Sequence, residues 1–583
     1  MSQMDSDYVR AASVSEVAKK GCMTVHVAGH TIALFAYGDS FYAIDNRCPH
    51  MGFPLDRGTI EDGILTCHWH HARFDLESGG TFDQWADDIP HYPVVIQDGE
   101  IWIDISQHED PFEHQHRRLL VGLQRNISLV IGKAVLKLFE ENHDLLEPFR
   151  DGLEFGTGFR RDGWGQGLTI LTCMKNLSLF LSDKDKPRAM YHGLSAVSQD
   201  TIGSAPRFGV WPLPDEGTPI LTLRRWFRKF VEVRDAEGAE RCLISAVAAG
   251  ADDMQMADML FSAATDHRYI QAGHVLDFTN KALEALDLAG WDDAGTVLTS
   301  LARNYATAER MEESSSWRSP VDLVTLLNEA FEKIPAALEE GQKYITAELT
   351  SWKGRQDLVE MVLGDSPQST IDAMLTALTE GASVHDLASA VSYAAALRIA
   401  RFHTSNEFSD WDTALHTFTF ANAVEQGLRR ASSPELLRGV FDAAMSVYLD
   451  RFLNIPPARL PQAGQDNPYD DEILSILPSL LDRQQQVNEA GEAVAAYLYH
   501  GGELRPLFAT IGALLLREDR DFHTIQAVEA VFRQVQSLSN EEEITHMMIA
   551  AARYLAAHAP TVRAQGQTYQ IAQRLHRGEE LFT

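Results

Sequence analysis

The chain has 583 residues, 45% of them hydrophobic, which is the composition of a folded protein and not of a disordered one. Its formal net charge of −33 argues against nucleic acid and against an anionic membrane surface as partners, because both repel an acidic protein. No stretch approaches the ~18 uninterrupted apolar residues of a membrane span, and the acidic start lacks a signal-peptide core. Five cysteines without framework spacing favour a reducing compartment, so we expect a cytoplasmic protein.

The first hundred residues show the short apolar-polar alternation of a small antiparallel β-fold. Turns at Gly29 and Gly38 separate the first runs. The clearest hairpin turns at Asp98-Gly99, a dipeptide that suits a turn with positive φ. We expect strands at residues 23–27, 32–36, 42–44, 94–96 and 100–105.

Two loops rich in Gly and Pro each offer one thiolate and one imidazole. The first carries Cys48-x-His50 and the second carries Cys67-x-x-His70, with sixteen residues between His50 and Cys67. This is the ligand pattern of a 2Fe-2S cluster in which two histidines replace two cysteines on one iron. Zinc is the competing interpretation, but structural zinc sites usually pair Cys with Cys and His with His at short spacing, so the pattern favours iron.

The pattern resembles the Rieske ferredoxin family over about the first hundred residues. The resemblance extends to the lead-in at residues 42–48, to Phe74-Asp75 after the second loop and to the segment at 92–94. It implies one 2Fe-2S cluster held by Cys48, His50, Cys67 and His70.

Three histidines crowd the second loop, and the resemblance selects His70 among them. His68 follows Cys67 directly, so its side chain should diverge from that of the cysteine, whereas His70 is at the position that the family uses. His71 stands where relatives often have glycine. A role for His71 next to the cluster or on the surface therefore stays open.

Imidazole ligands make the cluster less negative and place its potential in a band of roughly −150 to +300 mV, within which hydrogen bonds to the sulfurs set the value. The high-potential members resemble the respiratory-chain Rieske protein and carry a Ser and a Tyr hydroxyl and an extra disulfide. Here Ala72 and Phe74 occupy the hydroxyl positions, and neither loop has a further cysteine. We expect a low-potential cluster of ferredoxin or oxygenase type.

The first 110 residues hold 18 Asp and Glu against 6 Lys and Arg. Such an excess forms a solvated acidic surface in any case. It also favours docking onto a basic patch of an external NAD(P)H-dependent reductase, as acidic electron carriers dock.

Residues 107–117 form a polar linker in our interpretation, and helical periodicity replaces strand alternation from residue 118 to the end. Capping boxes are expected at Ser383–Asp386 and Ser409–Asp412, and a helix stop at Gly290. A proline-rich break at about residues 454–471 predicts a surface excursion.

Histidines are scattered among these helices, and two of them have spacing that favours chemistry. His274, Asp277, Lys281 and Glu284 share one helical stripe, so His274 and Asp277 could hold a metal together. They could equally form a hydrogen-bonded pair inside a core. His416 lies one turn after Asp412 in an apolar run, whereas the capping box already accounts for Asp412. Isolated helical histidines, such as His192 and His523, are more often satisfied core residues.

A second resemblance, based on few residues, concerns the questin oxidase family of all-helical oxygenases. It depends on the order of Gly273-His274-Val-Leu-Asp-Phe, Asp410-Trp-Asp-Thr-Ala-Leu-His416 and Asp521-Phe-His523. It implies that His274, His416 and His523 converge on one pocket, whereas the substrate does not carry over.

The sequence thus predicts a multidomain protein with an all-β iron-sulfur domain at 1–106 and a large all-α domain at 118–583. We expect an oxidoreductase of oxygenase type, in which the cluster passes single electrons from a reductase to the helical domain. There His274, Asp277 and His416 would hold non-haem iron or act as acid and base on a small organic substrate. The alternatives are a ferredoxin whose helical part is a docking scaffold without chemistry, and a redox or iron sensor.

Overall fold

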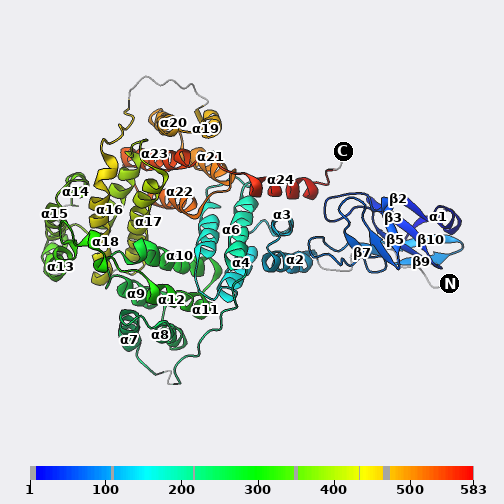
Figure 1. Ribbon diagram of the computed structural model, residues 1–583, viewed down its shortest axis with the longest axis horizontal. Helices are drawn as coiled ribbons and strands as arrows, with labels where there is room; N and C mark the ends of the chain where they lie inside the picture. The colour runs from blue at the N-terminus through cyan, green and yellow to red at the C-terminus, as the bar shows by residue number, and fades with distance from the viewer. Residues whose placement is uncertain are drawn as a thin grey trace. The chain divides into compact units, whose positions relative to one another are not determined.

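The computed structural model describes residues 8–106, 111–214, 217–346, 352–431, 433–463 and 473–581. The chain forms two compact units. Unit 1 consists of residues Met1–Pro148 and Gln565–Thr583, and unit 2 of residues Phe149–Ala564. All strands lie in unit 1, and beyond β10 the described residues contain helices but no strand (Figure 1).

The β-part of unit 1 contains three small antiparallel sheets, with strand orders β1-β10-β9, β2-β3-β4-β8 and β5-β6-β7. Their strands are β1 Tyr8–Ser13, β2 Cys22–Val27, β3 His30–Tyr37, β4 Ser40–Asp45, β5 Thr59–Glu61, β6 Ile64–Thr66, β7 Arg73–Asp75, β8 His91–Tyr92, β9 Val94–Gln97 and β10 Glu100–Asp104.

Tight turns fix the register of the β-hairpins. Asp98 and Gly99 have φ of 52° and 77° between β9 and β10, and Ala28 and Gly29 have φ of 49° and 86° between β2 and β3. These positive values belong to the turns that match the twist of paired strands. The strands expected from the sequence are confirmed. The sequence did not predict helix α1 Val14–Lys20, whose first turn is capped by the Ser13 hydroxyl.

Helices complete unit 1. They are α2 Pro111–Arg125, α3 Ser128–Asn142 and α24 Ala564–His576, and the short 3-10 helix η1 Leu55–Arg57 lies between the β-strands. Residues 107–110 of the expected linker lie outside the described residues. From Pro111 onward that segment is helical, so 111–117 is not a linker. The C-terminal helix also belongs to unit 1, so the boundary is not a single cut near residue 110.

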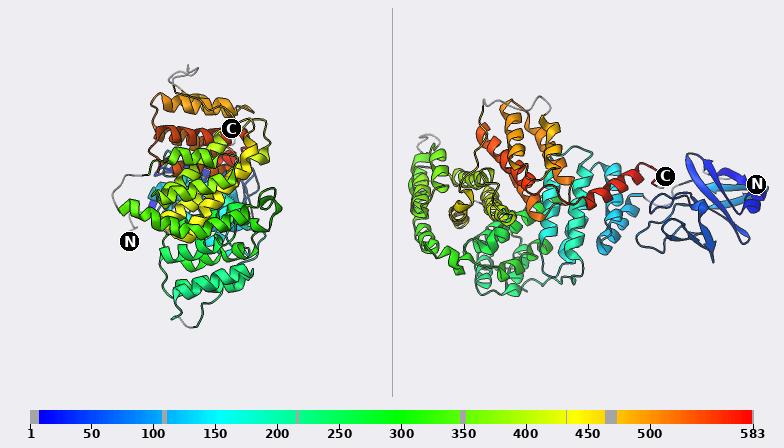
Figure 2. Two further views of the ribbon diagram at one scale, coloured as in Figure 1. Left: turned by 90° about the vertical axis from the view of Figure 1, so that its left-hand side faces the viewer. Right: turned by 45° about the horizontal axis from the view of Figure 1, so that its top comes forward.

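Unit 2 is built from helices, which lie in successive rows in the left view of Figure 2. Contacts are most extensive between α5 and α6, α20 and α23, and α16 and α17. The α-helices are α4 Leu146–Gly158, α5 Gln166–Leu177, α6 Lys186–Thr201, α7 Ile220–Glu232, α8 Ala236–Ala248, α9 Asp253–Ala264, α10 His274–Ala289, α11 Ala294–Thr299, α12 Ala302–Thr307, α13 Leu323–Thr346, α14 Arg355–Val362, α15 Pro367–Thr379, α16 Val384–Ala400, α17 Phe408–Arg430, α18 Pro434–Leu449, α19 Ile473–Leu481, α20 Val487–Tyr499, α21 Leu504–Leu516, α22 Phe522–Val535 and α23 Glu541–Ala557.

The 3-10 helices of unit 2 are η2 Ile270–Gly273, η3 Met311–Glu313, η4 Ser315–Trp317 and η5 Asp450–Asn454. After η5, residues 455–463 form no helix or strand, and the rest of the expected excursion falls largely on residues 464–472, outside the described part. Within the described residues no helix combines the length and the apolar character that crossing a bilayer requires.

Local signals placed two of three helix ends correctly. The capping box of Ser383 and Asp386 at the start of α16 is confirmed, and so is the stop of α10 at Gly290. The box expected at Ser409–Asp412 is wrong. Helix α17 instead begins at Phe408, where Glu407 and Asp410 form the capping box. Asp412 is therefore free of a capping role.

Candidate metal centres

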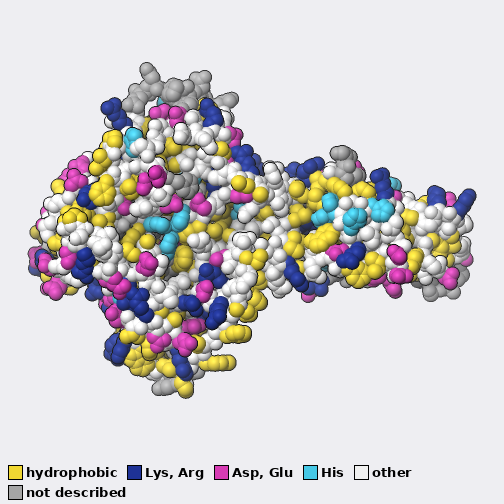
Figure 3. All heavy atoms as spheres, viewed as in Figure 1, with side chains coloured by type: hydrophobic (Ala, Val, Ile, Leu, Met, Phe, Trp, Pro, Cys, Tyr) yellow, Lys and Arg dark blue, Asp and Glu magenta, His cyan; other side chains and the backbone are white. Residues whose placement is uncertain are grey.

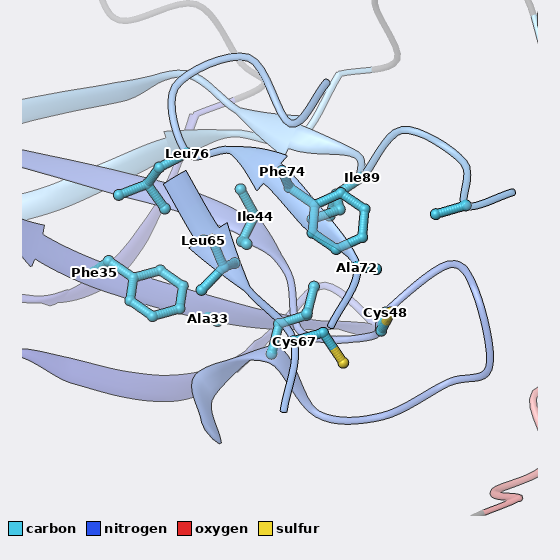
Figure 4. Close-up of a cluster of buried hydrophobic side chains, with 12 residues drawn as sticks. Ala33, Phe35, Ile44, Cys48, Leu65, Cys67, Ala72, Phe74, Leu76 and Ile89 are labelled. Carbon is cyan, nitrogen blue, oxygen red and sulfur yellow. The ribbon is translucent and has the colours of Figure 1, made fainter. Parts of the chain in front are cut away.

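Two loops of the same construction bring Cys48 and Cys67 together at one end of a buried apolar core (Figure 4). In the first loop the amide of Cys48 donates to the carbonyl of Phe53, and the amide of Gly52 donates back to the Cys48 carbonyl, both at 2.8 Å. In the second, the Cys67 amide donates to Ala72 at 2.9 Å and the His71 amide donates to Cys67 at 3.0 Å.

The fifth residue of each loop turns through a left-handed conformation. Gly52 has φ of 85° and His71 has φ of 62°. Because such a φ suits glycine best, His71 adopts a backbone conformation that non-glycine residues seldom adopt.

The two cysteine side chains contact each other through a hydrogen bond. The Cys48 thiol donates to the sulfur of Cys67, and this bond lowers the pKa of Cys67 to about 6, with help from the amides of Trp69 and His70. The same contact and burial raise the pKa of Cys48. Backbone amides directed at both sulfurs are the surroundings that stabilise thiolate ligands.

Two of the loop histidines face each other beside the sulfurs. The ring centroids of His50 and His70 lie 4.8 Å apart. His50 Nδ1 is buried and has no hydrogen-bond partner among the described residues, and burial lowers the pKa of His50 to about 4. His68 is instead directed at the Thr59 hydroxyl, at 3.3 Å. Two thiols and two neutral imidazoles therefore meet at one place and could hold a diiron cluster.

Comparison with known proteins identifies this domain. The model of the Rieske [2Fe-2S] domain family matches residues 7–93. The 3-phenylpropionate/cinnamic acid dioxygenase ferredoxin subunit of Photorhabdus laumondii is 39% identical over 80 residues, which are 13% of this chain and 76% of that protein. The chain belongs to the Rieske [2Fe-2S] family. Its N-terminal domain is a ferredoxin-type electron-transfer domain, and such a domain implies a 2Fe-2S cluster.

Further Rieske ferredoxins are similar over the same length. The ferredoxin component of the p-cumate 2,3-dioxygenase system of Pseudomonas putida is 26% identical over 106 residues, 18% of this chain and 90% of that protein. Among solved structures, the ferredoxin of carbazole 1,9a-dioxygenase from Nocardioides aromaticivorans IC177 is 28% identical, with a TM-score of 0.17. The match covers 17% of this chain and 100% of that ferredoxin.

A second group of potential ligands lies in unit 2, where α10, α17 and α22 meet. One ring nitrogen from each of His274, His416 and His523 lies within 4.8 Å of the other two, and the Nε2 atoms of His416 and His523 are 2.9 Å apart. All three rings are partly exposed, and Figure 3 shows histidines gathered on the face of unit 2 at these helices. These three residues are called the histidine triad below.

Burial and neighbouring imidazoles favour the neutral form of His274 and His416. Burial, together with the neighbouring rings of His416 and His523, lowers the pKa of His274 to about 3. The pKa of His416 falls to about 4 for the same reasons. Neutral imidazole is the form that binds a metal ion, and three clustered imidazoles are a site that could hold one.

The backbone directly before His274 passes through several left-handed residues. Tyr269, Gln271, Ala272 and Gly273 have φ of 41°, 51°, 50° and 93°. The Gln271 amide donates to the Glu309 carbonyl at 2.7 Å, which holds this segment in place. Left-handed residues in succession cost free energy and persist only where their surroundings enforce them, and they gather at functional sites.

A carboxylate lies behind the triad. An oxygen of Asp412 lies 3.9 Å from Nδ1 of His523, and Asp412 accepts a hydrogen bond of 2.6 Å from the Tyr554 hydroxyl. A carboxylate beside the outer nitrogen of a metal-binding histidine orients the ring and raises its basicity. Asp412 was not expected at this site, because the capping box predicted at Ser409–Asp412, which is wrong, accounted for it.

Asp277, which we expected to act with His274, does not join the triad. It is buried and accepts a hydrogen bond from Gln526 of α22. Burial raises its pKa to about 7, against the effect of that hydrogen bond. Asp277 lies three residues after His274 on α10. Its side chain meets Gln526 of α22 in the interior and not the histidine triad.

The rest of the expected stripe continues as a buried polar network between the same two helices. Lys281 donates to Glu284 at 2.9 Å and to Glu529 at 2.6 Å. Asn176 donates to both carboxylates at 2.8 Å, and Arg533 donates to Glu284 at 3.1 Å. The stripe is thus a hydrogen-bonded core that holds α10 against α22, the helices that carry His274 and His523.

Other histidines of unit 2 are satisfied elsewhere. His192 contacts the Leu516 carbonyl at 3.1 Å, His267 contacts Glu312 at 2.8 Å and His403 contacts Ser405 at 2.7 Å. His523, which helix spacing alone left as an isolated residue, is the exception. The resemblance to the questin oxidase family, which was an expectation from the sequence, was the signal that pointed to it.

Proposed function

We propose that this protein is an oxidoreductase of oxygenase type in which a Rieske cluster supplies single electrons to a metal-dependent reaction in unit 2. The observation that carries the proposal is the occurrence of the histidine triad in a chain that begins with a Rieske domain. A Rieske cluster transfers one electron at a time, so its electron acceptor must be able to take up single electrons. A non-haem iron ion is such an acceptor.

In the cluster domain, Cys48 and Cys67 would supply the thiolates and His50 and His70 the imidazoles. A bound 2Fe-2S cluster takes up and releases one electron at a time. His70 is exposed, whereas His50 is partly buried against Trp85, whose ring centroid lies 4.6 Å away. The edge of His70 is therefore the place where electrons would enter or leave.

In unit 2 the triad would hold a non-haem iron ion. Asp412 would orient His523 through its outer nitrogen, and the strained segment before His274 would fix the ring of His274. Phe278 and Phe522 pack beside His274, with ring centroids 5.5 and 5.8 Å from its ring. Aromatic walls beside a partly exposed metal site favour a small organic substrate with an apolar or aromatic body.

Covalent fusion supports the pairing of the two centres. A tether keeps a donor and an acceptor at an effective concentration in about the millimolar range, so electron delivery does not wait for diffusion. Electrons would reach the cluster from an external NAD(P)H-dependent reductase, and the acidic surface of the N-terminal domain favours a basic docking patch on that enzyme.

The competing function is that of an electron carrier whose helical unit has no chemistry of its own. The relatives favour it, because they are ferredoxin subunits or components of dioxygenase systems. In that case unit 2 would serve as a docking scaffold and the triad would hold no metal.

Iron analysis combined with EPR on the anaerobically reduced protein separates the two functions. The oxygenase requires more than two iron atoms per chain, and His416→Ala or His523→Ala should remove the excess and leave the cluster signal unchanged. His192→Ala is the matched control, because His192 is a buried histidine outside the triad. Two iron atoms per chain in the wild type, unchanged in the triad variants, would refute the oxygenase.

A further inference from the structure

The helices of unit 1 contact the cluster loops, although they lie outside the residues that match the Rieske family. Arg118 of α2 donates to the Ala86 carbonyl and forms an ion pair of 2.9 Å with Asp87. Both acceptors follow Trp85, the residue that packs on His50. At the other end of the chain, the carbonyl of Glu579 accepts a hydrogen bond of 3.1 Å from Arg47, which directly precedes Cys48.

Lys133 of α3 makes the contact closest to the cluster ligands. Its ammonium donates a hydrogen bond of 2.6 Å to the carbonyl of Pro49, the residue between Cys48 and His50. Among the described residues no carboxylate oxygen lies within 4.0 Å of this ammonium. The nearest acidic group that influences it, Asp87, is already paired with Arg118 and His114.

The charge of Lys133 therefore acts on the cluster loop. Burial lowers the pKa of Lys133, and Asp87 counters this from a distance; the same burial keeps water from screening the ammonium fully. The charge also reaches the ligands, since Lys133 is one of the groups that act electrostatically on His50. A fixed positive charge beside a cluster stabilises the state with one more electron, because that state is more negative.

We propose that Lys133 is a positioning residue of the Rieske centre, which fixes the Cys48–His50 loop through Pro49 and raises the reduction potential of the cluster. The inference rests on the proposed placement of the cluster at Cys48, His50, Cys67 and His70, and is independent of any reaction in unit 2. A helix beyond the ferredoxin-like domain would thereby adjust the driving force for electron transfer.

The test is an EPR-monitored redox titration of the full chain with reconstituted cluster. Lys133→Met removes both the charge and the hydrogen bond, Lys133→Gln removes the charge and keeps a donor, and Lys133→Arg keeps the charge. We expect a negative shift of the midpoint potential in the Met and Gln variants and a midpoint near the wild-type value in the Arg variant. The matched control is Lys137→Met one turn along α3, where Lys137 is exposed and paired with Glu140 at 2.8 Å.

The outcomes are distinct. Equal midpoints in the wild type, Lys133→Gln and Lys133→Arg would overturn the inference, even if Lys133→Met fails to retain a cluster. A shift of the same size in Lys137→Met would overturn it too, because the effect would then be one of general surface charge. Absence of a Rieske signal in the wild type would instead contradict the proposed placement of the cluster.

Discussion

Replacement of Gly273 by alanine tests whether the strained segment before α10 positions the histidine triad. Gly273 has φ of 93°, and a Cβ at this position would lie 2.9 Å from Cβ of Phe420. The left-handed conformation costs a non-glycine residue about 1–3 kcal/mol, and overpacking adds about 1–3 kcal/mol. We therefore expect Gly273→Ala to lower the free energy of unfolding by about 2–6 kcal/mol.

The same change should weaken metal binding, because His274 follows Gly273 directly. Metal-ligand distances tolerate displacements of only about 0.2 Å, so a backbone shift that relieves the contact with Phe420 would misplace the ring. We expect a loss of iron affinity of about 10–100-fold, the range for residues that orient ligands. Urea unfolding measures the stability, and anaerobic titration with Fe(II) against a chelator measures the affinity.

Gly290→Ala is the matched control at the other end of α10. Its φ of 103° gives the same kind of backbone cost, but the nearest atom to an added Cβ is a guanidinium nitrogen of Arg150 at 3.9 Å. This variant should lose about 1–3 kcal/mol of stability and keep its iron affinity. The positioning role of Gly273 would be refuted if both variants keep the wild-type iron affinity, or if both lose iron affinity to the same extent.

Three further outcomes are expected. Lys281→Met leaves the buried carboxylates of Glu284 and Glu529 uncompensated, so urea unfolding should show a loss of about 3–5 kcal/mol, against about 0–1 kcal/mol for Lys343→Met at the surface. Asp277 has a folded-state pKa raised from 3.8 to about 7, so its contribution to stability is present below pH 3.8 and is lost as the pH rises through 7. Asp277→Asn should therefore gain about 3 kcal/mol of stability relative to wild type between pH 5 and pH 8, and an equal difference at both pH values would contradict the assigned environment. The cluster midpoint should lie in the lower half of the band of roughly −150 to +300 mV, and a redox titration above its middle would refute the low-potential type.

The fold and the cluster ligands of the N-terminal domain could be predicted from the sequence because the sequence signals for them are local. Most strands pair with the next strand through a short turn, although β1 pairs with β10 and β4 pairs with β8, and Cys48 with His50 and Cys67 with His70 form two compact loops. Nothing beyond about a hundred residues had to be known. Helix α1 was missed because its seven residues show too little periodicity to stand out.

The histidine triad could not be derived in the same way. Spacing on one helix offers Asp277 as a partner of His274 and Asp412 as a partner of His416, yet 107 residues separate His416 from His523, its contact in the fold. Periodicity shows which residues share a face of a helix, but not which helix covers that face. Gln526 covers Asp277, and this single contact distinguishes a core residue from a ligand.

The two centres therefore differ in what they require of the fold. The Rieske loops close through their own backbone hydrogen bonds, and helices such as α3 adjust them from outside through single contacts like that of Lys133. The triad exists only while α10, α17 and α22 keep their register, which depends on the buried network around Lys281 and on the strained segment before His274. Substitutions that loosen unit 2 should for this reason abolish the triad long before they affect the cluster. A variant that keeps the cluster spectrum and loses the additional iron would then be the expected phenotype of core substitutions far from any ligand.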